Sequence, residues 1–410
     1  MKKILLIVLD GLADNPIPQL KNKTPLEAAK TPNLDFLAKK GICGLVKPWV
    51  QKGKLPTSED CHLALFGYPP KIFNPGRGVL EVLGIGERIS PEDVCLRGNF
   101  ATVKEDLTIL DRRAGRIEKT LPLILALNKI NVEDGKVIVK KAFGHRIGII
   151  IKGKDLSAKI TSNDPKKVGE KVLKILPKEK KAKKTVKILN EFLNKAREIL
   201  KNHPLNKRRE KMGKLPANYI LVRGAGKWKK IKRFKEKYGL RAGFIAGGTL
   251  YKGIARYLGM EEIKVEGANG LVNTNLKEKF TQAQKNLKKF DFIFLHIKAT
   301  DTLAEDGDFL GKKKFIEKVD KNIKLILKLE NTLIVVTGDH ATCCDLKRHC
   351  LNYTPILIYE KNIKGDKCQM FSEKECAKGK LGTFPQLKVM SKIFFLKSKK
   401  FLFDQFYSQI

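Results

Sequence analysis

Five short runs of almost wholly apolar residues constrain the fold of this chain more than any other feature of its sequence. Apolar runs of this length, without polar alternation, are typical of strands buried on both faces, as in a parallel sheet. Helical stretches lie between them, and one opens with Thr24-Pro25 and has Glu27 three residues after Thr24, the pattern of a capping box. Strands and helices in alternation predict an α/β fold with a mainly parallel sheet. The five runs are Ile4–Leu9, Tyr219–Val222, Phe292–Ile297, Leu333–Val336 and Ile356–Tyr359.

The middle of the chain, from about Gly76 to Pro216, has a different pattern. The segment "KVIVKKAFGHRIGIII" predicts a hairpin whose turn lies near "KAFG", and "GNFATV" and "LTILDRRAGRI" add strands of the antiparallel type. Residues 166–214 are rich in lysine and carry apolar residues at helical spacing, so amphipathic helices are expected, the first beginning at Asp164-Pro165. We therefore expect an α+β domain inserted into the α/β domain.

Polar residues suited to metal ions follow three of the apolar runs. The first run ends in Asp10, the run at 292–297 is followed by Asp301 and Glu305, and the run at 333–336 is followed by Asp339-His340 and then His349. An aspartate at one strand end is often only a helix cap, but ligands collect at the carboxyl ends of parallel strands. Mixed carboxylate and imidazole ligands suit Mn²⁺ or Zn²⁺, and two such ions side by side serve phosphoryl transfer. The three segments together predict a metal centre.

Ser58 in "KLPTSEDCHLALFGY" is a candidate nucleophile for such a centre. It is expected at a helix start, where free backbone N–H groups favour an anion, and a serine bound to a divalent ion loses its proton more easily. The alternative is a plain N-cap. His62, one helical turn later, either contacts the site or packs in the core, and His296, inside a predicted strand, is assigned to the core.

A series of motifs runs in order along nearly the whole chain: "VLDG", "TPNLDFLAKKG", "HLALFGY" after Ser58, "GNFATV", "DRRAGR", "RGAG", "HIKATD…DGDF" and "TGDHAT…LKRH". Together they resemble the archaeal-type 2,3-bisphosphoglycerate-independent phosphoglycerate mutases of the alkaline phosphatase superfamily. The resemblance implies an alkaline-phosphatase-like three-layer core of residues 1–75 and 216–410, with an inserted substrate-binding or lid domain of residues 76–215. It also implies interconversion of 3-phosphoglycerate and 2-phosphoglycerate through a phosphoserine, with two divalent metals and without 2,3-bisphosphoglycerate.

Carried over position by position, the resemblance assigns the metal ligands. Asp10, Ser58, Asp339 and His340 would surround one ion, and Asp301, Glu305 and His349 the other, with Ser58 as the nucleophile. Mn²⁺ is the expected metal, with Mg²⁺, Co²⁺ or Zn²⁺ as alternatives.

Two departures from the family pattern bear on these ligands. Glu305 stands where the family usually has a histidine, which either makes a harder metal site or weakens it. "ATCC" replaces the usual "STPC" and puts Cys344 near the metals, either as a ligand or as a small buried residue.

Cations are expected to bind the carboxylate and phosphate of the substrate. Arginine grips both groups bidentately, although a solvated turn is an equal alternative for each arginine of "DRRAGR". An inserted domain that closes over the core would exclude water and so prevent hydrolysis. The candidates are Arg112, Arg113, Arg116, Lys252 and Lys298, with His145, Arg146, Arg97 and Asn99 as weaker ones and Arg223 as substrate-binding or structural.

The formal net charge of +40, from 83 Lys and Arg against 43 Asp and Glu, raises the question of a polyanion partner. Lysines that solvate helix faces, or a field that attracts small anionic substrates, are the alternatives. The sequence has no zinc knuckle and no ribonucleoprotein-type aromatic motif, so a small phosphoglycerate is favoured over nucleic acid as the partner. Two other functions stay open: a metal-dependent phosphatase or phosphotransferase acting on another small phosphoester, and a weakly active relative that binds a polyanion.

The chain is expected to be soluble, reduced and cytoplasmic. Its start, "MKKILLIVLDG", has the Lys-Lys of a signal peptide, but the apolar run is short, Asp10 ends it and no small-residue cleavage site follows. No apolar run approaches the length that spans a bilayer. The eight cysteines include no CxxC pair. The sequence does not predict the oligomeric state.

Overall fold

The computed structural model describes residues 2–398, which fold into two compact units. Within those residues, the core unit comprises 2–74, 232–248 and 258–398, and the second unit comprises 75–231 and 249–257. The sequence analysis assigns residues 216–231 and 249–257 to the core. Their contacts lie within the second unit, because one strand joins its sheet and one helix packs against its first helix. No helix within residues 2–398 has both the length and the apolar character needed to cross a membrane.

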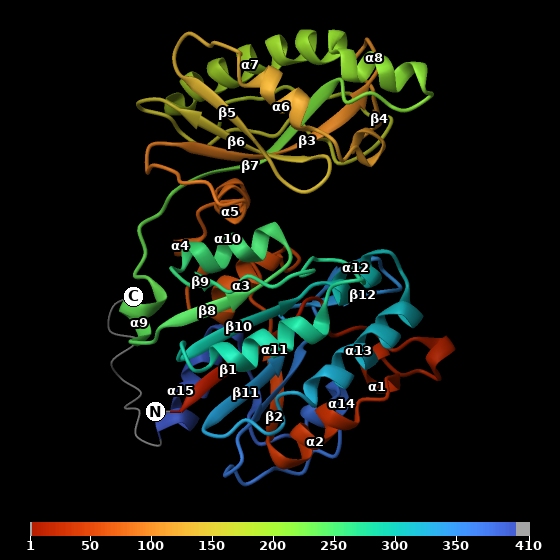
Figure 1. Cartoon of the computed structure of the whole chain (residues 1–410), viewed down its shortest axis with the longest axis vertical. Coiled ribbons are helices and arrows are strands. Elements are labelled where there is room, and N and C mark those ends of the chain that lie inside the picture. Colours follow the sequence, from red (N-terminus) through yellow and green to blue (C-terminus); the bar gives the residue numbers. More distant parts are fainter. Residues whose placement is uncertain (1, 399–410) are drawn as a thin grey trace. The chain divides into compact units, whose positions relative to one another are not determined.

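The core unit is built on an eight-stranded sheet in the order β15-β2-β14-β11-β1-β10-β8-β9 (Figure 1). β1 pairs in parallel with both β10 and β11, whereas β14 runs antiparallel to its two neighbours. The predicted mainly parallel sheet is confirmed, and four of the five apolar runs form its strands β1, β10, β11 and β14. The bounds are β1 Lys3–Leu9, β2 Ile42–Lys47, β8 Ala242–Ile245, β9 Glu261–Glu262, β10 Phe292–Ile297, β11 Thr332–Thr337, β14 Thr354–Tyr359 and β15 Gly382–Pro385.

Helices cover both faces of this sheet, which gives the core its three layers. On one face, alternate strand residues such as Leu5 and Ile7 pack against α2 (Pro32–Lys40), α11 (Leu276–Asn286) and α13 (Phe309–Ile323). On the other face, Phe292 and Phe294 contact Phe66, at the end of α3. The remaining core helices are α1 Pro25–Ala28, α3 Ser58–Leu65, α4 Pro70–Phe73, α9 Phe234–Tyr238, α12 Ala299–Glu305, α14 Glu373–Cys376 and α15 Val389–Ser398, and a short hairpin is formed by β12 Ala341–Cys343 and β13 Arg348–Cys350.

The second unit is an antiparallel sheet with helices on its faces. The strands follow the order β4-β3-β6-β5. β7 also pairs antiparallel with β3, on the edge of β3 opposite to β6. The predicted hairpin is confirmed as β5–β6, because Ala142 donates its N–H to the carbonyl of Arg146 across the turn. The bounds are β3 Val94–Val103, β4 Ile109–Asp111, β5 Lys136–Lys141, β6 Arg146–Lys152, β7 Tyr219–Lys227, α5 Arg77–Gly84, α6 Leu121–Leu127, α7 Lys183–Asn202, α8 Pro204–Lys211 and α10 Thr249–Tyr257.

Two local predictions for this region are wrong. The run Tyr219–Val222 is not a strand of the parallel sheet; it lies in β7 and pairs antiparallel with β3, since an apolar run fits any strand that is buried on both faces. The helix expected after Asp164-Pro165 does not form. Residues 166–178 are irregular, because their backbone groups pair with residues 107–109 and 159–163 instead of with each other. The second lysine-rich helix is present as α7.

Candidate active site

The carboxyl ends of β1, β10 and β11 bring the predicted metal ligands together. Asp10 follows β1, Asp339 and His340 follow β11, and Asp301 lies on α12 just after β10. All four side chains are buried. Gly11 allows this close approach: it adopts a left-handed φ of 61°, and a β-carbon there would lie 2.9 Å from Asp301 Cβ.

Asp10, Asp339 and His340 form the first cluster, with donor atoms within 4.8 Å of one another. His340 Nε2 lies 3.4 Å from Asp10 Oδ1 and 3.2 Å from Asp339 Oδ2. Both carboxylate oxygens of Asp10, and Oδ2 of Asp339, are buried without a hydrogen-bond partner among residues 2–398. Buried carboxylate oxygens without donors are costly, and a divalent cation removes that cost. The donor set therefore fits a divalent metal.

Asp301, His340 and His349 form the second cluster, so His340 belongs to both. The rings of His340 and His349 stack with centroids 3.9 Å apart, and His349 Nε2 lies 3.5 Å from Asp301 Oδ1. Nδ1 of His349 is 2.8 Å from the Pro56 carbonyl oxygen, so it donates there and its Nε2 faces the site.

Lys298 stands between the carboxylates of the two clusters. Its Nζ is 2.6 Å from Asp301 Oδ2 and 3.6 Å from Asp10 Oδ2. Burial alone would raise the pKa of both aspartates, but Lys298 and the nearby histidines outweigh it and hold each pKa below its usual range. Burial lowers the pKa of His340, whereas Asp301 outweighs burial at His349 and raises its pKa to about 9. The carboxylates thus stay charged and attract positive charge.

Ser58 lies at the first cluster as the first residue of α3. Its Oγ is 3.2 Å from His340 Nε2. Thr57, not Ser58, caps this helix, since the Thr57 side chain accepts the N–H of Asp60 at 3.3 Å. The plain N-cap alternative for Ser58 is therefore wrong, and its hydroxyl faces the carboxylate and imidazole groups.

Three residues outside the predicted set of metal ligands also contact the site, and for His62 this was one of the two alternatives. His62 Nδ1 is 3.2 Å from Asp339 Oδ2, and His296, buried as expected, has its Nε2 3.5 Å from Asp10 Oδ2. Thr342 donates to Asp301 Oδ1 at 2.6 Å and orients that carboxylate. The sequence carried a signal for His62 only, because it lies one helical turn after Ser58.

Glu305 lies outside both clusters. It ends α12 with an exposed side chain, and desolvation together with the charge of Asp301 raises its pKa. The charge of Asp301 therefore affects the Glu305 carboxyl, although Glu305 does not belong to the donor set of the second cluster. The role of Glu305 as a metal ligand stays a prediction.

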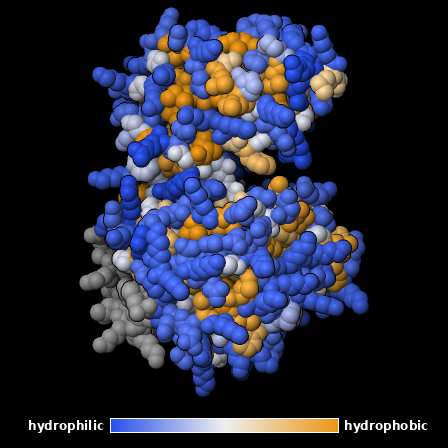
Figure 2. Space-filling model, viewed as in Figure 1, coloured by the Kyte–Doolittle hydropathy of each residue, from blue (hydrophilic) through white to orange (hydrophobic). Residues whose placement is uncertain are grey.

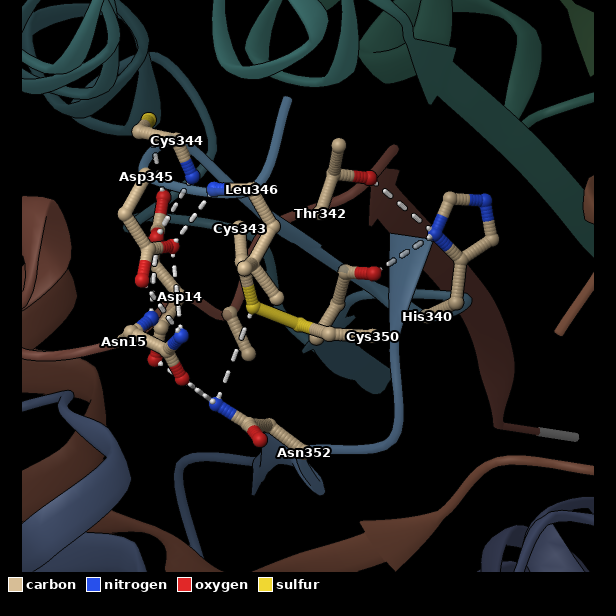
Figure 3. Close-up of a disulfide and its surroundings, with 12 residues drawn as sticks. Asp14, Asn15, His340, Thr342, Cys343, Cys344, Asp345, Leu346, Cys350 and Asn352 are labelled. Atoms are coloured by element: carbon tan, nitrogen blue, oxygen red, sulfur yellow. Dashed lines mark hydrogen bonds between the residues drawn. A yellow bond between two sulfur atoms is a disulfide. The ribbon is translucent and has the colours of Figure 1, made fainter. Parts of the chain in front are cut away.

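The β12–β13 hairpin next to the site is closed by a disulfide between Cys343 and Cys350 (Figure 3). The expectation that the chain is fully reduced is wrong for this pair. The register pairs Ala341 with Cys350 and Cys343 with Arg348, so the two cysteines lie diagonally on the same face, with Cα atoms 6.0 Å apart. His349 lies between them in register, opposite Thr342.

Cys344 is held away from the metal clusters. Its thiol donates to Asp14 Oδ2 at 3.0 Å and its N–H to Asp14 Oδ1 at 2.9 Å, while Lys312 Nζ pairs with Asp14 Oδ2 at 2.8 Å. Burial raises the pKa of this thiol. Of the two alternatives for Cys344, the small buried residue fits the structure.

The predicted substrate cations of the second unit fall into groups. Arg112 makes two bonds to Asp164, at 3.0 and 2.7 Å, and Arg223 adds a third at 3.1 Å, so Arg112 and Arg223 support the fold. Arg146 and Arg113 lie near His145: burial, and then the charges of these two arginines, lower the pKa of His145 to about 4. Arg116 lines a cavity of about 640 Å³ with Arg208 and Arg209, and Lys252 is half-buried on α10.

Arg97 and Asn99 are buried on β3. Arg97 Nη1 lies 3.4 Å from Glu81 Oε1. Burial, together with the charges of neighbouring arginines, outweighs Glu81 and lowers the pKa of Arg97 to about 9. This part of the second unit concentrates positive charge around one buried carboxylate.

Comparison with known proteins agrees with the sequence motifs. The family model described as the Metalloenzyme superfamily matches residues 2–394. The 2,3-bisphosphoglycerate-independent phosphoglycerate mutase 1 of Archaeoglobus fulgidus is 45% identical over 387 residues, which cover 92% of this chain and 94% of the relative. The corresponding protein of Picrophilus torridus is 42% identical, covering 93% and 94%.

Two solved structures also match nearly the whole chain. The cofactor-independent phosphoglycerate mutase of Thermoplasma acidophilum has a TM-score of 0.71 at 35% identity, covering 97% of this chain and all of that one. A solved protein of Pyrococcus horikoshii has a TM-score of 0.85 at 34% identity, covering 98% and 99%. On identity and coverage together, the chain belongs to the Metalloenzyme superfamily and, within it, to the archaeal 2,3-bisphosphoglycerate-independent phosphoglycerate mutases, a family of isomerases.

Proposed function

We propose that this protein interconverts 3-phosphoglycerate and 2-phosphoglycerate through a phosphoserine on Ser58, without 2,3-bisphosphoglycerate. The observation that carries the proposal is the buried Ser58 hydroxyl, 3.2 Å from His340 Nε2, where His340 is common to two carboxylate and histidine clusters. A nucleophile at the junction of two such clusters is the arrangement that two-metal phosphoryl transfer requires.

Two divalent ions are part of this proposal. Asp10, Asp339 and His340 would hold one beside Ser58, and Asp301 and His349 would hold the other. Glu305, whose pKa burial and the charge of Asp301 raise, is a further proposed ligand of the second ion. The bound ions, Mn²⁺ or else Mg²⁺, Co²⁺ or Zn²⁺, would lower the pKa of the Ser58 hydroxyl and offset phosphoryl charge.

The transfer is balanced in atoms and protons. Ser58 Oγ bonds to phosphorus as the bond between phosphorus and O3 of the glycerate breaks, and the Ser58 proton ends on O3. The glycerate then reorients, its O2 takes the phosphoryl group, and Ser58 regains a proton. The positive end of the α3 helix dipole and the Lys298 ammonium would support the phosphoryl oxygens. Water must be excluded, because hydrolysis of the phosphoserine would release free phosphate.

The glycerate carboxylate is assigned to cations of the second unit. Arg113 and Arg146 are the first candidates there, because Arg112 is already engaged by Asp164, and His145, whose pKa is lowered to about 4, would serve as a neutral hydrogen-bonding partner. Arg116 and Lys252 stay as secondary candidates.

An assay for product and free phosphate tests the proposal. Metal-stripped protein is given 3-phosphoglycerate without 2,3-bisphosphoglycerate and titrated with Mn²⁺, Mg²⁺, Co²⁺ and Zn²⁺. Metal-dependent 2-phosphoglycerate with little free phosphate is expected. Free phosphate alone would identify a phosphatase, and no product with salt-sensitive RNA binding would identify a polyanion-binding relative.

Ser58→Ala is the decisive variant. It is expected to lower kcat by about a thousandfold or more while substrate still binds. Thr57→Ser, which keeps a helix-capping hydroxyl next to Ser58, is the matched control and should retain most activity. Turnover by Ser58→Ala near the wild-type rate would refute the phosphoserine mechanism.

A further inference from the structure

Three of the six free cysteines meet inside the core unit, at a place that shares no residue with the candidate active site. Cys43 lies on β2, Cys368 in the segment between β14 and β15, and Cys376 ends α14. All three are fully buried. The Cys43 thiol donates to the Ala38 carbonyl at 3.7 Å and the Cys368 thiol to the Glu375 carbonyl at 3.2 Å, while Cys376 lies close enough to Cys43 to raise the pKa of the Cys43 thiol.

Asp366 adds a fourth donor to this group. One of its carboxylate oxygens and the Sγ atoms of Cys43 and Cys368 lie within 4.8 Å of one another. Oδ2 accepts the N–H groups of Cys43 and Lys380, at 2.7 and 3.0 Å, whereas Oδ1 accepts the N–H of Cys368 at 3.0 Å. These bonds fix the carboxylate against the thiols, and Oδ1, with one backbone donor, keeps a lone pair for a further partner.

We propose that Cys43, Cys368, Cys376 and Asp366 bind one Zn²⁺ ion as a structural site. Three sulfurs and one carboxylate oxygen are a soft, four-donor set of the kind that selects zinc in tetrahedral geometry. Two sulfurs on one zinc ion lie about 3.7 Å apart, so the donors need only a small inward shift. Binding releases the thiol protons to solvent, since the thiolate is the ligand.

The local chain gives this site a structural purpose. Between β14 and β15, the described backbone has only the four-residue helix α14 as regular structure. The segment is tied to the start of β2, where Asp366 donates its N–H to the Gly41 carbonyl and Leu381 donates to the Cys43 carbonyl. An ion that joins β2, the 366–368 loop and α14 would cross-link a segment that has little regular structure of its own.

Cobalt and zinc spectroscopy tests the proposal on the full chain. Co²⁺-loaded protein is expected to show sulfur-to-cobalt charge-transfer absorption, which the carboxylate and histidine ligands of the active site cannot produce. Cys43→Ser and Cys368→Ser should lose this absorption and one zinc per chain. Cys344→Ser and Cys95→Ser, which remove buried thiols elsewhere, should keep both.

A measurement on the unmutated protein covers the case in which the cysteine variants fail to fold. The zinc X-ray absorption spectrum of zinc-loaded wild type should contain sulfur neighbours at about 2.3 Å. Nitrogen and oxygen neighbours alone would overturn the proposal, as would a mass showing Cys43 disulfide-bonded to Cys368 or Cys376. The activity assay with Ser58→Ala is independent of this result, so either proposal can fail alone.

Discussion

Glu373, in the core unit, is a carboxyl group whose surroundings disfavour its charge. Its Oε2 accepts the Thr24 hydroxyl at 2.8 Å, while Oε1 is buried and has no hydrogen-bond partner within residues 2–398. Burial raises the pKa of Glu373 to about 7. The folded protein therefore holds this proton at pH values where the unfolded chain has lost it.

The sign of the resulting pH dependence follows from the two states. Below about pH 4.5 both states are protonated and Glu373 has no effect. Between about pH 4.5 and about pH 7 the unfolded chain ionises this group while the folded state keeps it protonated, so the folded state loses stability, and above about pH 7 the loss stays constant. Glu373→Gln should raise the free energy of unfolding at pH 8 by on the order of 2 kcal/mol and change it little at pH 4. Thermal melts across this range check it, with exposed Glu118→Gln as the control. An equal effect at both pH values would contradict it.

Glu305 decides how strongly the second cluster binds its ion. Glu305→His places an imidazole where the family usually has one and should lower the Kd of that site for Mn²⁺ by about tenfold, whereas Glu305→Gln should not. Calorimetric titration of metal-stripped protein measures this directly. Unchanged metal affinity and rate in Glu305→His would show that position 305 is not a ligand.

The sequence predicted part of the site because some ligands carry a local signal. Asp10, Asp301 and Asp339 each follow an apolar run, so strand periodicity alone places them at one edge of the sheet. His296 and Thr342 have no such signal. His296 reaches Asp10 because β1 and β10 pair Val8 with His296, and Thr342 reaches Asp301 through a hairpin at the loop. The sequence of one segment does not show which residue of a distant segment will lie opposite it.

At the scale of elements, the β12–β13 hairpin fixes His349. In the strand register, His349 lies between the two cysteines of the disulfide that closes the hairpin. Asn352 and Asp14 hold the ends of the hairpin through further hydrogen bonds (Figure 3). This small element is therefore expected to depend on its cross-link.

The double variant Cys343→Ser/Cys350→Ser should lower the free energy of unfolding by about 2 kcal/mol and weaken metal binding at the second cluster several-fold. Reduction of the wild type by a dithiol should have the same effect. Denaturant unfolding and metal titration, with Cys344→Ser as the control, measure both quantities. A reduced hairpin with unchanged metal affinity would show that the disulfide does not position His349.

The two wrong element predictions have one physical cause. An apolar run such as Tyr219–Val222 reports burial on both faces and not the direction of its partner, so it fits β7 as well as a parallel strand. Apolar residues at helical spacing after Asp164 likewise form no helix, since Asp164 accepts the N–H of Lys166 and Val168 is exposed. Tertiary pairing overrides both patterns.

For the whole molecule, the +40 charge should act on the binding of an anionic substrate. Hydrophilic side chains cover most of the face seen in Figure 2. A strong positive field raises the local concentration of small anions and is screened by salt. The KM for 3-phosphoglycerate should therefore rise several-fold between about 50 mM and about 500 mM KCl, with a smaller change in kcat. A KM that is constant over this range, with constant thermal stability, would exclude this role for the charge.

The division of the core unit into separate chain segments sets an order of events during synthesis. β1 is synthesised long before both of its partners, because β10 and β11 begin only at Phe292 and Thr332. The second unit, in contrast, is complete once Tyr257 has been made. A nascent chain therefore carries the apolar β1 without its sheet partners until β10 and β11 have been made, by which time every residue of the second unit is already present.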